Sequence, residues 1–165
     1  MIRHLRLDDI DAVANIYNHY ISNTVISFEE VPVSADEIKD RVDAVVTKDL
    51  PWLVAEEAGE IIGYAYASPW NSRTAYKNSA EITVYLSHLH TSRGVGTSLY
   101  RAIFKQLEER LFHTVIGGIT LPNPTSVALH EKFGMRKVAH FKEVGFKFEQ
   151  WLDVGYWQVT LNNSS

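Results

Sequence analysis

Apolar residues along the chain follow two spacings, one typical of helices and one typical of strands. They recur at every third or fourth position over 10–20, 35–46 and 95–110, which predicts three amphipathic helices. Alternating or short continuous apolar runs predict strands at 2–7, 51–56, 61–67, 81–86, 114–121, 135–144 and 151–161. Both kinds of element are therefore spread along the whole chain.

Residues with particular capping or backbone chemistry set the predicted helix ends. Asp8 is expected to cap the first helix, and Ser34 with Glu37 forms a capping box for the second. A fourth helix is predicted to begin at Asn123-Pro124, because proline suits a first helical turn. Gly134 suits a left-handed stop and is expected to end that helix.

The order of these elements indicates one domain over residues 1–165. Paired strands between helices come first, and a strand–helix–strand unit follows, without an internal repeat, low-complexity segment or linker. We expect a layered α/β (α+β) domain with a central mixed, twisted sheet of about six to seven strands and helices on both faces.

Composition narrows the class of protein. The 165 residues are 45% hydrophobic and 22% charged with a net charge of -4, and no basic run favours a nucleic-acid partner. Because there is no cysteine, a disulfide framework, a thiolate nucleophile and a cysteine-ligated metal are excluded. His88 and His90 have no third ligand in register, so no metal is expected. We find neither a signal peptide nor an apolar run long enough for a bilayer, and expect a cytoplasmic protein with no membrane partner.

The segment from 81 to 110 carries the strongest functional signal. A strand at Glu81–Leu86 precedes the glycine turn Arg93-Gly94-Val95-Gly96 and a long amphipathic helix. The first N–H groups of a helix lack intrahelical partners and the helix dipole is positive there, so this turn is a candidate phosphate site. It fits neither the dinucleotide fingerprint nor the Walker motif. The remaining interpretations are another pyrophosphate-bearing cofactor or a plain structural turn.

Together with the block Asn123-Pro-Thr-Ser-Val-Ala-Leu-His-Glu-Lys-Phe-Gly-Met135, these segments resemble the acetyl-CoA-binding motifs of the GNAT superfamily of N-acetyltransferases. Similarity to its phosphinothricin acetyltransferase branch extends over nearly the whole chain, in Ile16–Tyr20, Ser27–Glu29, Val54–Glu57, Gly63–Ala65, Val144–Lys147 and Trp151–Asp153. Small members of that branch acetylate phosphinothricin, methionine sulfoximine or methionine sulfone. The resemblance implies acetyl-CoA as co-substrate, a small-molecule amine as acceptor and a homodimer.

Two positions depart from the family pattern. The turn usually begins with Arg or Gln where this chain has Thr91, which alters phosphate contacts but leaves the backbone cradle in place. The loop before Glu81 offers Asn71 and Arg73, where another Arg is expected in phosphinothricin-type members. That departure bears on the acceptor more than on the reaction class.

Acetyl transfer to an amine needs a base for the ammonium proton, stabilisation of the thioester oxygen and protonation of the leaving sulfur. Glu81 is suited to be the base, a role that the resemblance also implies, and His130 stands where many relatives carry a tyrosine thought to protonate the sulfur. We expect direct transfer in a ternary complex, because no cysteine can carry the acyl group. The predicted cofactor-binding residues are Val84, Tyr85, Leu86, Ser92, Arg93, Gly94, Val95, Gly96, Thr97, Asn123 and Ser126. The predicted acceptor-binding residues are Phe28, Glu29, Arg73 and Tyr76.

Purely structural roles are the alternatives at these positions. Glu81 could be a solvated strand edge, His130 a surface helix residue and Asn123 a helix cap, and the acceptor residues could be ordinary loop residues. Two other functions also stay open: a protein N-terminal or lysine acetyltransferase on the same fold, and a non-catalytic acetyl-CoA-binding module.

Overall fold

The computed structural model describes residues 1–90 and 93–161, which are built around a seven-stranded sheet. The sheet order is β1-β2-β3-β4-β5-β7-β6, and every neighbouring pair is antiparallel except β4 and β5. The mixed sheet predicted from the sequence is therefore confirmed. The strands are β1 (Ile2–His4), β2 (Trp52–Glu57), β3 (Glu60–Pro69), β4 (Ser79–Leu86), β5 (Thr114–Leu121), β6 (Arg136–Lys147) and β7 (Gln150–Thr160).

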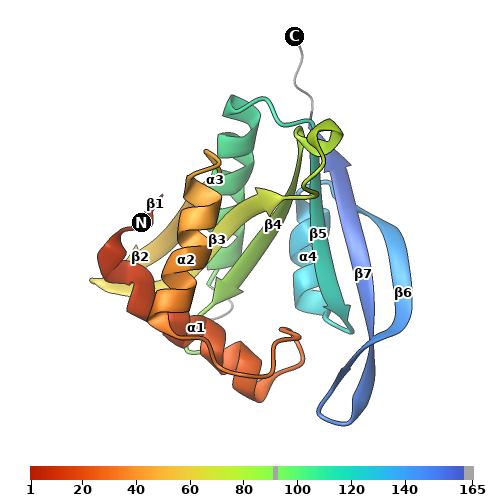
Figure 1. Cartoon of the computed structure of the whole chain (residues 1–165), viewed down its shortest axis with the longest axis horizontal. Coiled ribbons are helices and arrows are strands. Elements are labelled where there is room, and N and C mark those ends of the chain that lie inside the picture. Colours follow the sequence, from red (N-terminus) through yellow and green to blue (C-terminus); the bar gives the residue numbers. More distant parts are fainter. Residues whose placement is uncertain (91–92, 162–165) are drawn as a thin grey trace.

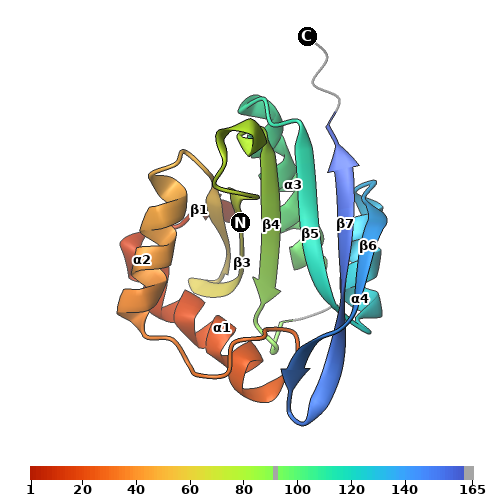
Figure 2. The ribbon, with the colours of Figure 1, turned by 45° about the vertical axis from the view of Figure 1, so that its right-hand side comes forward.

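Helices cover both faces of the sheet, as the order of the elements predicts (Figures 1 and 2). On one face lie α1 (Ile10–Asn23) and α2 (Ala35–Val46), and on the other α3 (Val95–Glu109) and α4 (Pro124–Lys132). The apolar stripes of α1, α2 and α3 are buried in the core, so most of their stabilisation comes from packing, whereas the buried residue of α4 is His130. Fully or nearly fully buried helix residues include Val13, Ile21, Ile38, Leu99, Ile103 and Leu107.

Three of the predicted helix ends agree with the structure and one differs. The fourth helix begins at Pro124 with Asn123 as its N-cap, as predicted. The Ser34 hydroxyl accepts a hydrogen bond from the Glu37 N–H at 3.1 Å, which is one half of the predicted capping box, while the Glu37 carboxylate accepts from Arg41. Gly134 is left-handed with φ 81°. The prediction that Asp8 caps the first helix is wrong. A 3-10 turn at Leu7–Asp9 comes before α1, because buried Asp9 accepts from the Arg6 N–H and stabilises that tighter turn. The first strand ends at His4, before the predicted end at residue 7.

The two central parallel strands separate along their length. Their pairing covers only Ser79–Thr114, Ala80–Val115 and Glu81–Ile116, and beyond this point β4 follows β3 while β5 follows β7 (Figure 2). The backbone groups that would have paired across the gap are then available to a ligand. Glu81 therefore lies where the opening between the strands begins. No helix in the described residues is long and apolar enough to cross a membrane.

Candidate functional site

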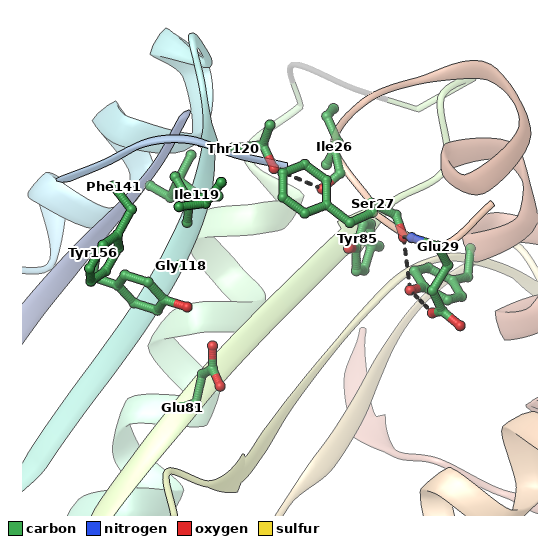
Figure 3. A pocket seen from close by; sticks show the side chains of 14 residues that line it. Ile26, Ser27, Glu29, Glu81, Tyr85, Gly118, Ile119, Thr120, Phe141 and Tyr156 are labelled. Carbon is green, nitrogen blue, oxygen red and sulfur yellow. Dashed lines mark hydrogen bonds between the residues drawn. The ribbon is translucent and has the colours of Figure 1, made fainter. Parts of the chain in front are cut away.

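Glu81 projects into the opening between β4 and β5. Its side chain is half-buried, and this burial raises the pKa of its carboxyl group because an ion loses solvation there. Figure 3 shows the carboxylate of Glu81 and the hydroxyl of Tyr156 pointing into the same space, from β4 and β7 respectively. A carboxyl group with a raised pKa in a cleft is suited to accept a proton near neutral pH.

Two cavities adjoin at Glu81. The larger, of about 740 Å³, extends toward the segment after α1 and the β6–β7 hairpin. The smaller, of about 230 Å³, extends toward α3 and α4. Both are lined by Ile26, Glu81, Tyr85, Gly118, Ile119 and Thr120. Glu81 thus lies in the wall that two adjoining compartments share, one toward the segment after α1 and the other toward α3 and α4.

The larger cavity contains two of the predicted acceptor residues, Phe28 and Glu29. The Phe28 ring lies on Gly145 of β6, where a Cβ would come within 2.4 Å of the ring, so only glycine admits this contact. Glu29 accepts two hydrogen bonds from Arg41 of α2, at 2.7 and 2.8 Å, and a third from the Tyr17 hydroxyl. The Arg41 bonds hold the pKa of Glu29 below its usual range. Glu29 is therefore ionised and oriented, with its charge balanced by Arg41.

The smaller cavity contains the predicted residues Val84, Asn123, Ser126 and His130, together with Tyr100 of α3. The Asn123 side chain accepts from the Ser126 N–H at 3.1 Å, so it caps α4, which is one of the two roles considered for it.

His130 is buried, not a surface helix residue, with an exposed fraction of 3%. Its Nδ1 lies 2.7 Å from the Ser126 carbonyl oxygen, which can only accept, so Nδ1 carries the proton. Nε2 then accepts from the Tyr100 hydroxyl at 3.1 Å. Burial lowers the pKa of His130, which favours the neutral ring.

The glycine turn forms the N-terminus of α3, as predicted. Gly94 has φ 75°, and a Cβ there would meet nothing within 4 Å, so the turn is open to a ligand. No side chain of the described residues caps this helix end. The Lys132 ammonium group donates to the Thr97 hydroxyl, in the first turn of α3, at 3.4 Å. The helix dipole disfavours a cation at this helix end unless an anion binds beside it. Ser92, also predicted to bind the cofactor, and Thr91 lie outside the described residues.

The remaining cofactor residues lie close to this turn. A Cβ added at Gly96 would lie 3.3 Å from the Leu129 side chain, so the first turn of α3 packs closely against α4. Arg93 is ion-paired with Glu57 at 2.8 Å. The carbonyl oxygen of Leu86 accepts from the Tyr20 hydroxyl, which ties the end of β4 to α1.

Arg73 and Tyr76 are not brought together with Phe28 and Glu29. They line a separate depression of about 290 Å³ beside the loop before β4, where Thr74–Tyr76 forms a 3-10 turn. Among the described residues that line the larger cavity there is no cation.

Several residues at the site were not singled out as site residues from the sequence. Tyr17, Tyr100 and Tyr156 occupy positions that read as helix or strand packing, and only the fold directs their hydroxyl groups to the cavities. Lys132 follows an unremarkable helical pattern. No group of described residues has the arrangement of a metal site.

The comparisons with known proteins all point to acetyltransferases. Residues 2–155 match the family model described as an acetyltransferase (GNAT) domain. The chain is 40% identical over 157 residues to a phosphinothricin N-acetyltransferase of Streptomyces viridochromogenes, covering 95% of this chain and 85% of that protein.

Two solved structures are similar over nearly the whole chain. A phosphinothricin acetyltransferase of Sinorhizobium meliloti in complex with acetyl-CoA has a TM-score of 0.95 and 33% identity, covering 98% of this chain and 88% of that one. A ribosomal-protein-alanine N-acetyltransferase of Brucella melitensis has a TM-score of 0.95 and 32% identity, covering 98% and 99%.

Proposed function

Because this chain belongs to the GNAT family of acetyltransferases, we propose that it acetylates the amine of a small amino-acid-like acceptor of the phosphinothricin, methionine sulfoximine or methionine sulfone type. It is an N-acetyltransferase that uses acetyl-CoA. The observation that supports the mechanism is the position of Glu81 between two adjoining cavities. Acyl donor and acceptor amine can then reach one base from opposite sides.

The residues present fit acetyl-CoA on the side of the smaller cavity. The open, uncapped N-terminus of α3 at Gly94–Gly96 suits a pyrophosphate, and Lys132 supplies a positive charge beside it. The separated edge of β4, including Val84, Tyr85 and Leu86, offers backbone groups to the amide-bearing pantetheine arm and the thioester oxygen. When bound, acetyl-CoA supplies the activated acyl group.

In this proposal Glu81 removes the proton that keeps the acceptor amine from reacting. Burial raises the pKa of Glu81, which makes it a stronger base than an ordinary glutamate. The amine then attacks the acyl carbon directly, without an acyl-enzyme intermediate. Tyr156 shares the space in front of the carboxylate and is placed to bind the same amine.

His130 is proposed as the acid for the departing sulfur, acting through Tyr100. Once Nε2 has taken up a proton from solvent, the imidazolium gives it to the Tyr100 oxygen while the Tyr100 hydroxyl passes its own proton to the departing sulfur, which leaves a CoA thiol, an intact tyrosine and a neutral His130. Burial lowers the pKa of His130, which favours this release. The Tyr100 hydroxyl in turn faces the smaller cavity, where the sulfur would leave.

For the acceptor we propose the larger cavity, with Phe28 and the oriented Glu29 in its wall. Arg73 and Tyr76 stay predicted acceptor residues, since the loop that holds them leads directly into β4 two positions before Glu81. Their role requires that this loop reach over the opening when the acceptor's carboxylate is bound.

We further propose a cytoplasmic homodimer, in keeping with a cytoplasmic pool of acetyl-CoA. The β6–β7 hairpin exposes an apolar face, which a second copy would cover. Its exposed side chains are Val138, Phe141, Val144, Phe146, Phe148 and Trp151. Trp151→Ser should shift the sedimentation coefficient to that of a monomer. The control is Leu7→Ser, because Leu7 is similarly exposed but lies in the turn before α1, and this variant should sediment like the parent. Identical sedimentation of all three proteins would contradict this interface.

Free thiol released from acetyl-CoA tests the function. The panel contains phosphinothricin, methionine sulfoximine, methionine sulfone, unmodified amino acids and short peptides with free N-termini. We expect turnover with at least one of the first three compounds, at a higher kcat/KM than with any peptide. Acetyl-CoA binding without release across the panel would instead support a binding module.

The alternative acceptor is a protein N-terminus, which the likeness to the ribosomal-protein-alanine N-acetyltransferase favours. A peptide beginning with alanine would then be the best substrate of the panel. Because the two acceptors compete for one cavity, each should inhibit acetylation of the other, and the ratio of kcat/KM decides between them.

A further inference from the structure

The segment between α1 and α2, residues 24–34, forms one wall of the larger cavity and is called the acceptor loop here. It lacks regular structure, so its position depends on contacts with its surroundings. One contact is Phe28 on Gly145, and another is the Thr120 hydroxyl, which donates to the Ile26 carbonyl at 3.4 Å (Figure 3). Both fasten the loop to the strands across the cavity.

A third and stronger contact comes from Lys147, at the end of β6. Its side chain is buried, with an exposed fraction of 2%. The ammonium group donates to the carbonyl oxygens of Ile21 and Ser27, each at 2.7 Å, across 126 and 120 residues of sequence. It also lies 5.1 Å from the centre of the Phe148 ring. Lys147 thus joins the end of α1, the acceptor loop and the hairpin.

The positive charge matters at this position. Ile21 lies in the last turn of α1, where carbonyl groups have no intrahelical partner and the helix dipole favours a cation. Burial lowers the pKa of Lys147, and the nearby carboxylates Glu30 and Glu29 oppose this by favouring its charged form. A buried cation persists only if such groups compensate for its lost hydration.

We propose that Lys147 is a positioning residue that holds the acceptor loop over the cavity and thereby sets the affinity for the acceptor. This inference rests on the proposed function, because it takes the larger cavity as the acceptor site. Lys147 touches the carbonyl group of Ser27, and the next two residues, Phe28 and Glu29, form the cavity wall. A loop released from Lys147 would let Phe28 leave its place. Glu29, in contrast, keeps its bonds from Arg41 and Tyr17.

The test compares Lys147→Met with Lys105→Met, an exposed lysine on α3. Methionine keeps the length and apolar stem but removes the charge and both hydrogen bonds. We expect Lys147→Met to raise the KM of the acceptor about tenfold or more, with kcat at saturating acceptor and the KM of acetyl-CoA within about threefold. Lys105→Met should leave all three constants unchanged. A merely structural loss would lower kcat and both affinities together.

Chemical restoration of the charge provides a second arm. The chain has no cysteine, so Lys147→Cys introduces a single thiol. This thiol can be alkylated in the unfolded chain, which is then refolded. Aminoethylation yields a lysine-like ammonium group and should restore the KM of the acceptor. Ethylation, which gives a neutral side chain, should not. Equal acceptor KM values for the two products would overturn the proposal.

Hydrogen exchange separates this inference from the proposed function. Amides of residues 24–34 should exchange faster in Lys147→Met than in the parent or in Lys105→Met, whether or not any amine is acetylated. If the parent acetylates no amine but the loop is released, the proposed function fails and the anchoring stands. If the variant does not refold, hydrogen exchange of the lysine Nζ protons in the parent tests the anchoring. One ammonium group should exchange far more slowly than the others. Uniformly fast exchange of all lysine ammonium groups would overturn the anchoring.

Discussion

The Tyr100 hydroxyl donates a hydrogen bond to Nε2 of His130, and the two rings meet edge to face with centroids 5.2 Å apart. The direction of this bond follows from the other side of the imidazole, where the Ser126 carbonyl accepts from Nδ1. Tyr100 comes from α3 and His130 from α4, so the packing of these two helices fixes the tautomer of a buried histidine. Both groups face the smaller cavity.

The first prediction concerns this tautomer. Nitrogen NMR of the imidazoles should show His130 protonated at Nδ1 and titrating below the ordinary histidine range of about 6.5, because burial lowers its pKa. Since the unfolded chain takes up this proton first, the contribution of His130 to stability should fall as the pH drops below about 6.5. A His130 ring protonated at Nε2 would contradict the assignment.

The second prediction concerns the base. Glu81→Gln should lower kcat about 10²- to 10⁴-fold while acetyl-CoA binds as before, since the change removes a proton acceptor but little volume. Because burial raises the pKa of Glu81, the acid limb of kcat/KM should lie above the pKa of an ordinary glutamate, about 4.3. Activity is then lost as the pH falls through that limb. A glutamine variant with the parent's pH profile would remove Glu81 from the mechanism.

The third prediction uses two glycines in nearly the same conformation. Gly94 and Gly59 have φ of 75° and 79°, and a Cβ at either position would meet nothing within 4 Å. Alanine at each should therefore cost a similar amount of stability, about 1 kcal/mol. Only Gly94→Ala should also weaken acetyl-CoA binding, measured by calorimetry, because Gly94 lies at the N-terminus of a helix and Gly59 does not. Equal affinity of both variants would place the pyrophosphate elsewhere.

The fourth prediction concerns the ion pair between Arg3 of β1 and Asp9. Arg3 donates to both oxygens of Asp9, at 2.8 and 3.0 Å, and this holds the pKa of Asp9 below its usual range. Asp9→Asn should lower the free energy of unfolding by about 1–3 kcal/mol at neutral pH. The same stabilisation in the parent should be present above about pH 4 and disappear as the pH falls through the lowered pKa.

Denaturant unfolding checks this prediction, with the exposed neighbour Asp8 as the control. Asp8→Asn should change the free energy of unfolding by less than about 0.5 kcal/mol. If Asp9→Asn and Asp8→Asn unfold alike at neutral pH and in acid, the pair adds nothing measurable.

Much of the fold follows from local patterns. The spacing of Leu99, Ile103 and Leu107 predicted α3, and the residue chemistry of Ser34 and Gly134 predicted two helix ends, because each depends on neighbours within one or two turns. The first helix start was predicted at the wrong aspartate, since Asp9 is held by Arg3, which belongs to another element. Local capping rules do not include such a partner.

The sequence by itself determined the kinds of element, the glycine turn at the start of α3, and a carboxylate on the preceding strand. Only the tertiary structure decided that β4 and β5 part at Glu81, that Tyr100 meets His130, and that Lys147 reaches the acceptor loop. Periodicity and capping act over a few residues. These relationships join residues that are 30 to 120 positions apart, and they exist only because the sheet and its two helical layers bring those residues together.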